Sequence, residues 1–269
     1  QVLKDFAFES GSPFEMDLIG DDRELLLSVT DDFWRQNVVQ SDSDFSAYLL
    51  ARKQTPESLL QSIRNLVAKP YLQIQALPEV DAEAVTEALN NAFSHASQCW
   101  QKESEQIAAF LHSGGLSKTS YKPEKVERLQ ALLQLTFNEQ SCPLAWDELL
   151  ELATLEKAES SLKKGTALPE LRFWSAMDTL KQRYQDLDTI RALQLQQLRL
   201  QLLSYIREQL PQQKIQQQVQ SYDDLLINLS QALQGPQGEW LITRLREQFK
   251  AALIDEFQDT DPVQYDNFR

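Results

Sequence analysis

The sequence predicts a mainly α-helical protein with one short strand near its C-terminal end. Three observations support this fold class. Apolar residues recur at spacings of three and four along most long segments, which is the helical period. Only 7 of the 269 residues are Gly, which disfavours loop-rich and many-stranded folds. Residues 251–254 form the one short apolar run bounded by charged residues that is typical of a buried parallel strand.

The composition is that of a folded soluble protein. The chain is 42% apolar and carries 26 Lys and Arg against 40 Asp and Glu, a formal charge of −14. The excess acid is local, since residues 1–50 hold eleven acidic and three basic residues. The longest uncharged stretch, 225–238, contains Asn, Ser, Gln and Pro and is too polar for a membrane span. Residues 1–20 lack a signal-peptide pattern, so we expect a cytoplasmic protein with no membrane partner.

The first half of the chain contains three clear helical segments. Residues 21–38 place an apolar stripe behind an acidic first turn, which suits the helix dipole. Thr55 and Pro56 are typical of an N-cap and a first helical position, and that helix should end before Pro70. Residues 82–111 form the longest periodic run here and should end at Gly114.

The second half continues the helical pattern up to residue 249. We expect single helices over 124–137 and 144–157, another starting after Pro169, and one long helix over 177–209. The Gln-rich residues 212–220 are either low-complexity sequence or a solvated helix face, and the spacing of Ile215 and Val219 favours the helix. Two amphipathic helices, 222–233 and 239–249, precede the predicted strand.

The cysteine, histidine and tryptophan residues favour packing roles. His95 and Cys99 are four residues apart and could share a helix face as metal ligands, but a structural zinc site needs about four such ligands. A Cys–His nucleophile pair also lacks a third orienting group. Each Trp lies on an apolar stripe, which favours core packing over stacking on nucleic-acid bases; these are Trp34, Trp100, Trp146, Trp174 and Trp240.

Paired carboxylates follow the predicted strand directly. Asp255 and Glu256 would lie at its C-terminal tip, the position where open α/β sheets bind their ligands. In nucleotide hydrolysis, one such acid holds Mg²⁺ and the other accepts a proton from the attacking water. A solvated turn would also supply two adjacent acids, so the pair alone does not establish this chemistry.

The sequence around these acids resembles a known helicase motif. Leu253-Ile254-Asp255-Glu256-Phe257-Gln258-Asp259-Thr260-Asp261-Pro262-Val263-Gln264-Tyr265 is similar to the Walker B box of UvrD-type superfamily 1 DNA helicases. Tyr222-Asp223-Asp224-Leu225-Leu226 resembles the helix that precedes this box in the same family. Ala7-Phe8-Glu9-Ser10-Gly11 and Asp31-Asp32-Phe33-Trp34-Arg35 narrow the resemblance to the RecB family, the beta subunits of bacterial exodeoxyribonuclease V.

The resemblance implies a motor that hydrolyses ATP and moves 3′ to 5′ along DNA in recombination and double-strand break repair. Its partners would be DNA with a single-stranded end and RecC-like and RecD-like subunits. Asp255 would bind Mg²⁺ through water, and Glu256 would be the general base. Gln258 would sense the γ-phosphate, and Asp259 would brace the loop. Mg²⁺ and ATP are the cofactors that the resemblance implies for the full-length protein.

The phosphate-binding loop of such motors does not occur in this sequence. Lys164-Gly165-Thr166 lacks both the first glycine and the order of a Gly-x-x-x-x-Gly-Lys-Thr loop. We therefore expect an internal piece of the parent protein that, by itself, binds no cofactor and neither hydrolyses ATP nor cleaves DNA. By the resemblance, residues 1–14 lead out of the first motor domain, 15–210 form an inserted helical domain, and 211–269 return to the motor domain with the Walker B strand.

The inserted domain of this family lies over the duplex that enters the fork. Basic and hydroxyl side chains after Gly114 are the candidates for DNA phosphate contacts; they are Lys118, Thr119, Tyr121, Lys122, Lys125 and Arg128. A second candidate group is Lys157, Lys163 and Lys164. The alternative for both groups is an ordinary solvated loop. For the chain as a whole, the alternative is a helical scaffold that binds partner proteins through its acidic N-terminal block, with no ATPase or DNA-binding role.

Overall fold

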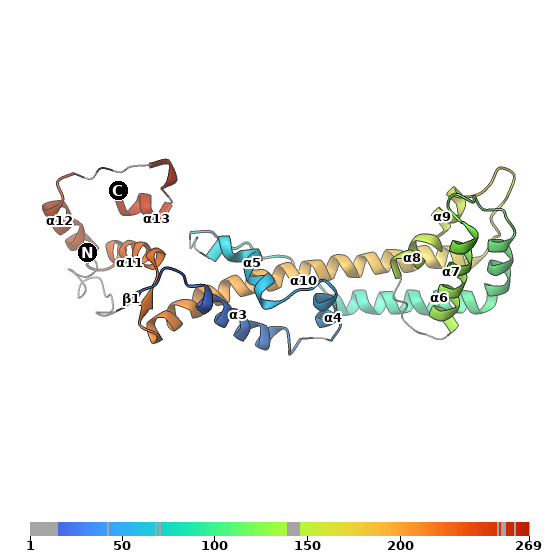
Figure 1. The fold of residues 1–269 in the computed structure, drawn as a ribbon, viewed down its shortest axis with the longest axis horizontal. Helices are drawn as coiled ribbons and strands as arrows, with labels where there is room; N and C mark the ends of the chain where they lie inside the picture. The colour runs from blue at the N-terminus through green and yellow to red at the C-terminus, as the bar shows by residue number, and fades with distance from the viewer. Residues whose placement is uncertain are drawn as a thin grey trace. The chain divides into compact units, whose positions relative to one another are not determined.

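The computed structural model describes residues 16–41, 43–67, 69, 71–138, 146–251, 253, 257–260 and 262–268. Almost all regular structure in these residues is helical, which confirms the mainly α prediction, and the strands described are two residues each (Figure 1). The elements are β1 (Asp17–Leu18), α3 (Arg23–Asn37), α4 (Ser43–Ala51), α5 (Pro56–Val67), α6 (Ala82–His112), α7 (Pro123–Asn138), α8 (Trp146–Leu152), α9 (Leu155–Ser160), α10 (Arg172–Gln216), β2 (Val219–Gln220), α11 (Tyr222–Gln234), α12 (Gly238–Gln248), the 3₁₀ turn η1 (Phe257–Asp259) and α13 (Pro262–Phe268).

Several helices begin or end where the sequence predicted. Pro56 is the first residue of α5, and the Thr55 hydroxyl accepts a hydrogen bond from the Ser58 amide at 3.2 Å. Asp81 caps α6 by accepting from the Ala84 amide at 2.9 Å. After α6, Gly114 adopts a φ of +73°, the left-handed conformation expected for a helix-terminating glycine.

One predicted helix, 144–157, is wrong as a single element. The described part forms two helices, α8 and α9, which are separated at Ala153 and Thr154. Thr154 has an extended backbone, with φ −86° and ψ 155°, and its side chain caps α9 by accepting from the Lys157 amide. Asp178 of α10 accepts a second hydrogen bond from the Leu155 amide at 2.9 Å. These caps satisfy amides that a continuous helix would have bonded internally, and so they stabilise the break.

Helix α10 is longer than predicted, and its Gln-rich end differs from the prediction. It joins the two expected helical segments into 45 residues and continues through Pro211 to Gln216. Residues 217–220 leave the helix, with Gln218 at a φ of +56°, and form the parallel pairing of β2 with β1. The Asp17 amide donates to the Gln218 carbonyl at 2.7 Å, and the Ile19 amide donates to Gln220 at 2.9 Å. This small sheet and helix α4 were not foreseen.

The chain divides into two compact units, each with its own core. Unit 1 contains residues 1–77 and 195–269, and unit 2 contains residues 78–194. In unit 1, α3, α4 and α5 pack on the C-terminal part of α10, around Leu59 and Leu202 (Figure 1). In unit 2, α6 to α9 pack on the N-terminal part of α10, around Leu129 and Phe173. The predicted family boundaries at residues 14 and 210 are not tested by this division and stay predictions.

Candidate functional site

The Walker B-like segment is described only in part. Asp255 and Glu256, the predicted magnesium ligand and general base, lie outside the described residues, as does Ile254. Of the expected buried strand, Ala251 and Leu253 are described, and neither belongs to a strand. The Leu253 side chain is 103% exposed. Burial is therefore not observed at Leu253, since neither strand in the described part of the chain lies beside it.

The residues that follow the acids form a short turn and a helix. Gln258, the predicted phosphate sensor, is an exposed residue of η1, and the Thr260 amide closes this turn by donating to the Phe257 carbonyl at 3.1 Å. The Phe257 ring meets the Tyr265 ring of α13 edge-on, with centroids 6.1 Å apart. The turn therefore contacts α13 through these two rings. Helix α13 begins at Pro262, a residue that favours the first helical position.

Parts of the two predicted groups of basic residues lie on neighbouring loops of unit 2, while Lys125 and Arg128 lie on α7 and Lys157 lies on α9. We name residues 113–122 and 161–168 the paired loops. Leu116 and Leu162 form an antiparallel bridge between them. The Ser117 amide donates to the Ser161 carbonyl at 2.7 Å, and the Lys163 amide donates to Gly115 at 2.9 Å. The two loops are separated in the sequence by residues 123–160, and no local signal indicates the bridge.

Gly115 is what allows the two loops to approach so closely. A Cβ atom at this position would lie 2.6 Å from the Thr166 Cγ2 atom. The Lys163 ammonium also donates to the Gly114 carbonyl at 2.6 Å, and so this side chain holds the loops together. Lys163, predicted as a contact for phosphate, is therefore engaged within the protein itself.

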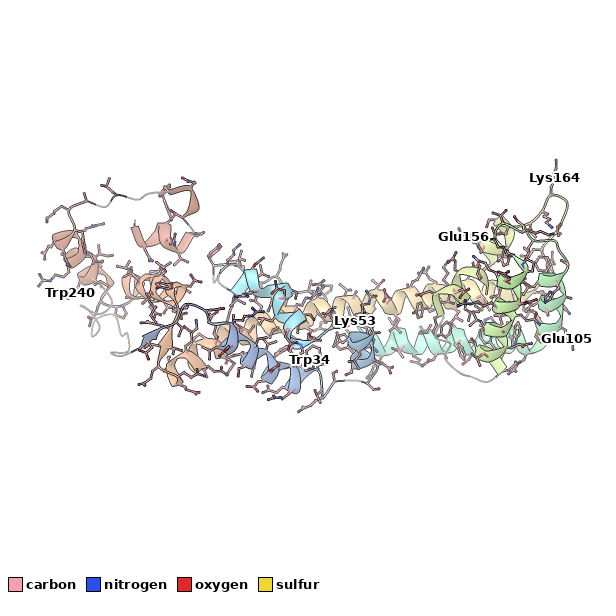
Figure 2. All side chains as sticks on the ribbon, viewed as in Figure 1. Trp34, Lys53, Glu105, Glu156, Lys164 and Trp240 are labelled. Atoms are coloured by element: carbon pink, nitrogen blue, oxygen red, sulfur yellow. The ribbon has the colours of Figure 1, made fainter. Side chains whose placement is uncertain are left out.

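Most of the predicted phosphate contacts are exposed. Lys118, Thr119, Lys122 and Lys125 are exposed on the first loop and the start of α7, and Lys164 is exposed on the second loop. Figure 2 shows the Lys164 side chain extending away from the ribbon, beyond the turn that Gly165 makes at a φ of +86°. These side chains offer exposed positive charge on the paired loops and the start of α7, where ammonium groups could contact phosphates without reading sequence.

Tyr121 does not belong to this exposed set. Its side chain is 4% exposed, and its hydroxyl donates to the Leu152 carbonyl at 2.6 Å. Burial, followed by the charge of Glu151, raises the pKa of Tyr121 to about 12. The prediction of a DNA contact is wrong for this residue, because its ring is in the core and its hydroxyl is already bonded.

Arg128 is exposed but paired. Its guanidinium lies 2.7 Å from the Glu148 carboxylate of α8. In the second group, Lys157 is half-buried on α9, beside the exposed Glu156 and Glu159. Neighbouring carboxylates thus reduce the positive field at these two basic residues. The strongest candidates are Lys118, Lys122 and Lys164 of the paired loops together with Lys125 of α7.

The tryptophan prediction is confirmed at the centre of the cores and wrong at one position. Trp100 and Trp174 are 3% and 1% exposed, and Trp34 and Trp146 pack against the cores from their edges. Trp240 of α12 is 42% exposed, and the Arg244 guanidinium lies 5.7 Å from its ring centroid (Figure 2). Helical spacing places Trp240 on an apolar stripe, but that stripe is only partly covered here.

No metal centre is found in the part of the chain that the structure describes. The Cys99 sulfur lies 3.8 Å from the His95 Nε2 atom, so the two side chains do share a helix face. No group of three or more His, Cys, Asp or Glu side chains with metal-binding geometry occurs in those residues. Burial is the main cause that raises the pKa of the Cys99 thiol, which keeps it protonated and a poor metal ligand.

The described helices also include none long and apolar enough to span a lipid bilayer.

Comparison with known proteins identifies the family. The model of the UvrD/REP helicase N-terminal domain matches residues 73–269. Over 98% of its length, the chain is 28% identical to the RecBCD enzyme subunit RecB of Escherichia coli strain K12, and 26% identical to that of Haemophilus influenzae. It spans 22% and 24% of these two relatives. A 68-residue stretch, 25% of the chain, is 38% identical to 6% of RecB of Mycobacterium tuberculosis.

Because the family model covers most of the chain and the likeness to RecB subunits extends over nearly all of it, the chain belongs to the UvrD/REP helicase N-terminal domain family.

Proposed function

We propose that this chain is part of an ATP-dependent 3′–5′ DNA helicase and nuclease subunit of a RecBCD-type complex, which acts in double-strand break repair and recombination. The family model and the similarity to RecB subunits support this proposal. DNA with a single-stranded end is the substrate, and RecC-like and RecD-like subunits are the partners. Mg²⁺ and ATP serve the full-length protein, while this chain by itself binds neither.

Asp255, Glu256 and Gln258 are the proposed nucleotide-site residues. Asp255 holds Mg²⁺ through water, Glu256 takes the proton of the attacking water, and Gln258 senses the γ-phosphate. This assignment rests on the resemblance of the motif to a Walker B box. In such sites one acid holds the Mg²⁺ bound to ATP, and the other orients the water that attacks the γ-phosphate. The exposure of Gln258 is compatible with a contact to a ligand.

Glu256→Gln tests this assignment in the full-length protein. The amide cannot accept a proton, so ATP turnover should fall by about a hundredfold or more, while the midpoint of thermal unfolding should stay nearly unchanged. Steady-state ATPase assays with DNA present measure the first quantity, and scanning calorimetry measures the second. Normal turnover in this variant would remove Glu256 from the catalytic machinery.

We infer further that the paired loops of unit 2 contact the phosphates of duplex DNA. The observation that carries this inference is the bridge between Leu116 and Leu162, which places the loop that carries Lys118 and Lys122 beside the loop that carries Lys164. Exposed ammonium groups on adjacent loops neutralise phosphates and release counterions, which gives binding without sequence preference. Because the net charge of the chain is −14, the protein as a whole repels DNA. Binding therefore depends on the local positive charge of these loops, and it should be strongest at low salt.

Fluorescence anisotropy of the chain with a duplex carrying a 3′ single-stranded tail tests this contact at two salt concentrations. The triple variant Lys118→Ala, Lys122→Ala, Lys125→Ala should bind at least about tenfold more weakly, and its logarithmic salt dependence should fall by about 2 to 3. The matched control changes three exposed lysines elsewhere, Lys53, Lys69 and Lys102, to Gln. It alters the net charge equally and should affect binding much less.

Equal losses in both triple variants would show a general charge effect rather than a site. Absence of salt-sensitive binding by the unchanged chain would instead favour the helical scaffold, whose role is to bind partner proteins.

A further inference from the structure

A buried lysine joins three elements of unit 1. Lys214 lies in the last turn of α10, and its side chain is only 6% exposed. Its ammonium nitrogen is 2.7 Å from Oδ2 of Asp224, 3.1 Å from Oδ2 of Asp22 and 3.1 Å from Oγ of Ser221. The ammonium donates hydrogen bonds to Asp224 and Ser221, and Asp22 adds an ion pair. The buried charge thus has two carboxylate partners and one hydroxyl acceptor, and such partners are what a stable buried ion requires.

The acceptors belong to the starts of two other helices. Asp22 immediately precedes α3, while Ser221 and Asp224 form the capping box of α11. The Asp224 carboxylate accepts from both the Ser221 amide, at 2.7 Å, and the Ser221 hydroxyl, at 2.8 Å. The Lys214 ammonium therefore ties the end of α10 to the first turn of α11 and to the start of α3. Removal of Lys214 would leave two carboxylates, each about a quarter exposed, without their shared cation.

Helix α11 in turn supports both flanks of the Walker B-like segment. Helix α12 precedes residues 250–261 and α13 follows them, and both helices pack on α11. The Asn267 side chain of α13 donates to the Leu226 carbonyl of α11 at 3.1 Å. The chain between Phe249 and Pro262 is therefore attached at each end to the same helix. The placement of α11 decides where both ends of that segment lie.

We propose that Lys214 is a positioning residue for the nucleotide-site segment. By fixing the first turn of α11 against the ends of α10 and α3, it sets the platform from which α12 and α13 hold the segment. Because α10 runs from unit 2 to Lys214 as one helix, the same residue connects the helix that carries the proposed DNA-contacting unit to the ATP-binding part. Lys214 touches no substrate in this role. The inference rests on the proposed function only for its link to ATP.

The test uses the full-length protein in its complex and the variant Lys214→Met, which keeps the length of the side chain and removes the charge. Two quantities are measured: amide hydrogen exchange in α11 and α13, and the number of base pairs unwound per ATP hydrolysed. Exchange at Asp224–Leu226 and in α13 should accelerate by about tenfold or more. The base pairs unwound per ATP should fall at least about twofold, while the affinity for tailed duplex stays unchanged.

Two further variants make the test specific. Arg64→Met removes a neighbouring but exposed ion pair, in which Arg64 and Asp21 are 40% and 63% exposed and 3.5 Å apart. It should change neither quantity. Lys214→Arg keeps the charge and should restore a large part of both. If Lys214→Met does not fold, Ser221→Ala replaces it, since that variant keeps the ion pairs and removes one acceptor of the ammonium. Both quantities should then change in the same direction by a smaller factor.

The outcomes are distinct. Faster exchange confined to the first turn of α11, with α13 and the unwinding ratio unchanged, overturns the proposal, as does an equal response in Arg64→Met. An unchanged full-length protein that neither hydrolyses ATP nor unwinds DNA overturns the proposed function instead. In that case the exchange of α13 still decides whether Lys214 positions this part of the chain.

Discussion

At the scale of single residues, burial separates side chains that look equivalent in the sequence. Tyr121 and Lys122 are adjacent candidates for a phosphate contact, yet Tyr121 is buried and Lys122 is exposed. The Tyr121 hydroxyl is stable in the core because it donates a hydrogen bond to the Leu152 carbonyl. A buried hydroxyl keeps such a bond because losing it without compensation costs free energy.

The Tyr121 hydroxyl predicts an alkaline loss of stability. Its folded pKa of about 12 lies above the ordinary tyrosine value of about 10, so the folded chain keeps a proton that the unfolded chain loses. This contribution to the free energy of unfolding is complete below pH 10 and is lost as the pH rises towards 12. Urea unfolding of the chain at pH 9 and pH 11 measures the loss.

Tyr121→Phe should lower the free energy of unfolding at neutral pH by about 1 kcal/mol and should remove most of this alkaline dependence. Tyr265→Phe, at a tyrosine that is 47% exposed, is the matched control and should leave both quantities unchanged. An undiminished alkaline loss in Tyr121→Phe would assign the effect to other groups.

At the scale of elements, several helix ends depend on partners distant in sequence. Helix α10 begins at Arg172 with no acid in its own first turn. Its first amides are satisfied by Glu103 of α6, whose carboxylate accepts from the Arg172 amide at 3.3 Å and from the Phe173 amide at 2.9 Å. A carboxylate at a helix N-terminus also interacts favourably with the helix dipole. The start of α10 is therefore fixed by tertiary packing rather than by a local cap.

Glu103→Ala should lower the free energy of unfolding by about 1 to 2 kcal/mol, the usual cost of losing a helix cap. Glu105→Ala is the matched control, since Glu105 is an exposed residue of the same helix (Figure 2), and should change stability by less than about 0.5 kcal/mol. Chemical denaturation followed by circular dichroism measures both values. Equal effects in the two variants would contradict the capping role.

At the scale of the whole molecule, two separate cores stabilise one chain. The core of unit 2 centres on residues such as Leu129 and Phe173, and the core of unit 1 centres on Leu59 and Leu202. Of the helices described, α10 contributes side chains to both. Each unit therefore excludes water around its own apolar surface, and each should respond mainly to substitutions in its own core.

Leu129→Ala should destabilise unit 2 by about 2 to 5 kcal/mol, because Leu129 is fully buried and its truncation leaves a cavity. Hydrogen exchange should accelerate in α6 and α7 much more than at Leu59 or Leu202 in unit 1. Mass spectrometry of exchanged peptides measures both units in one experiment, and Leu202→Ala should give the reverse pattern. Equal acceleration in both units would show that they unfold together.

The same method measures the amide of Leu253. The Leu253 amide should exchange far faster than those of α7, in keeping with its fully exposed side chain.

The sequence by itself determined the mainly helical fold, the ends of most helices and the family. These features depend on local signals, namely apolar period, caps such as Thr55 and helix-terminating Gly114, and the contiguous motif that starts at Leu253. Local signals also explain the errors. A continuous helix over 144–157 satisfies the periodicity, and only the caps from Thr154 and Asp178 favour the break.

The tertiary structure alone decided which distant residues meet. It placed the lysines after Gly114 beside those after Leu162, withdrew Tyr121 into the core, and surrounded Lys214 with Asp22, Ser221 and Asp224. The hydrophobic period along the chain does not predict these contacts, because it indicates which residues share a helix face and not which elements pack together. The physical reason is that burial and hydrogen bonding act between neighbours in space, and only the folded chain defines those neighbours.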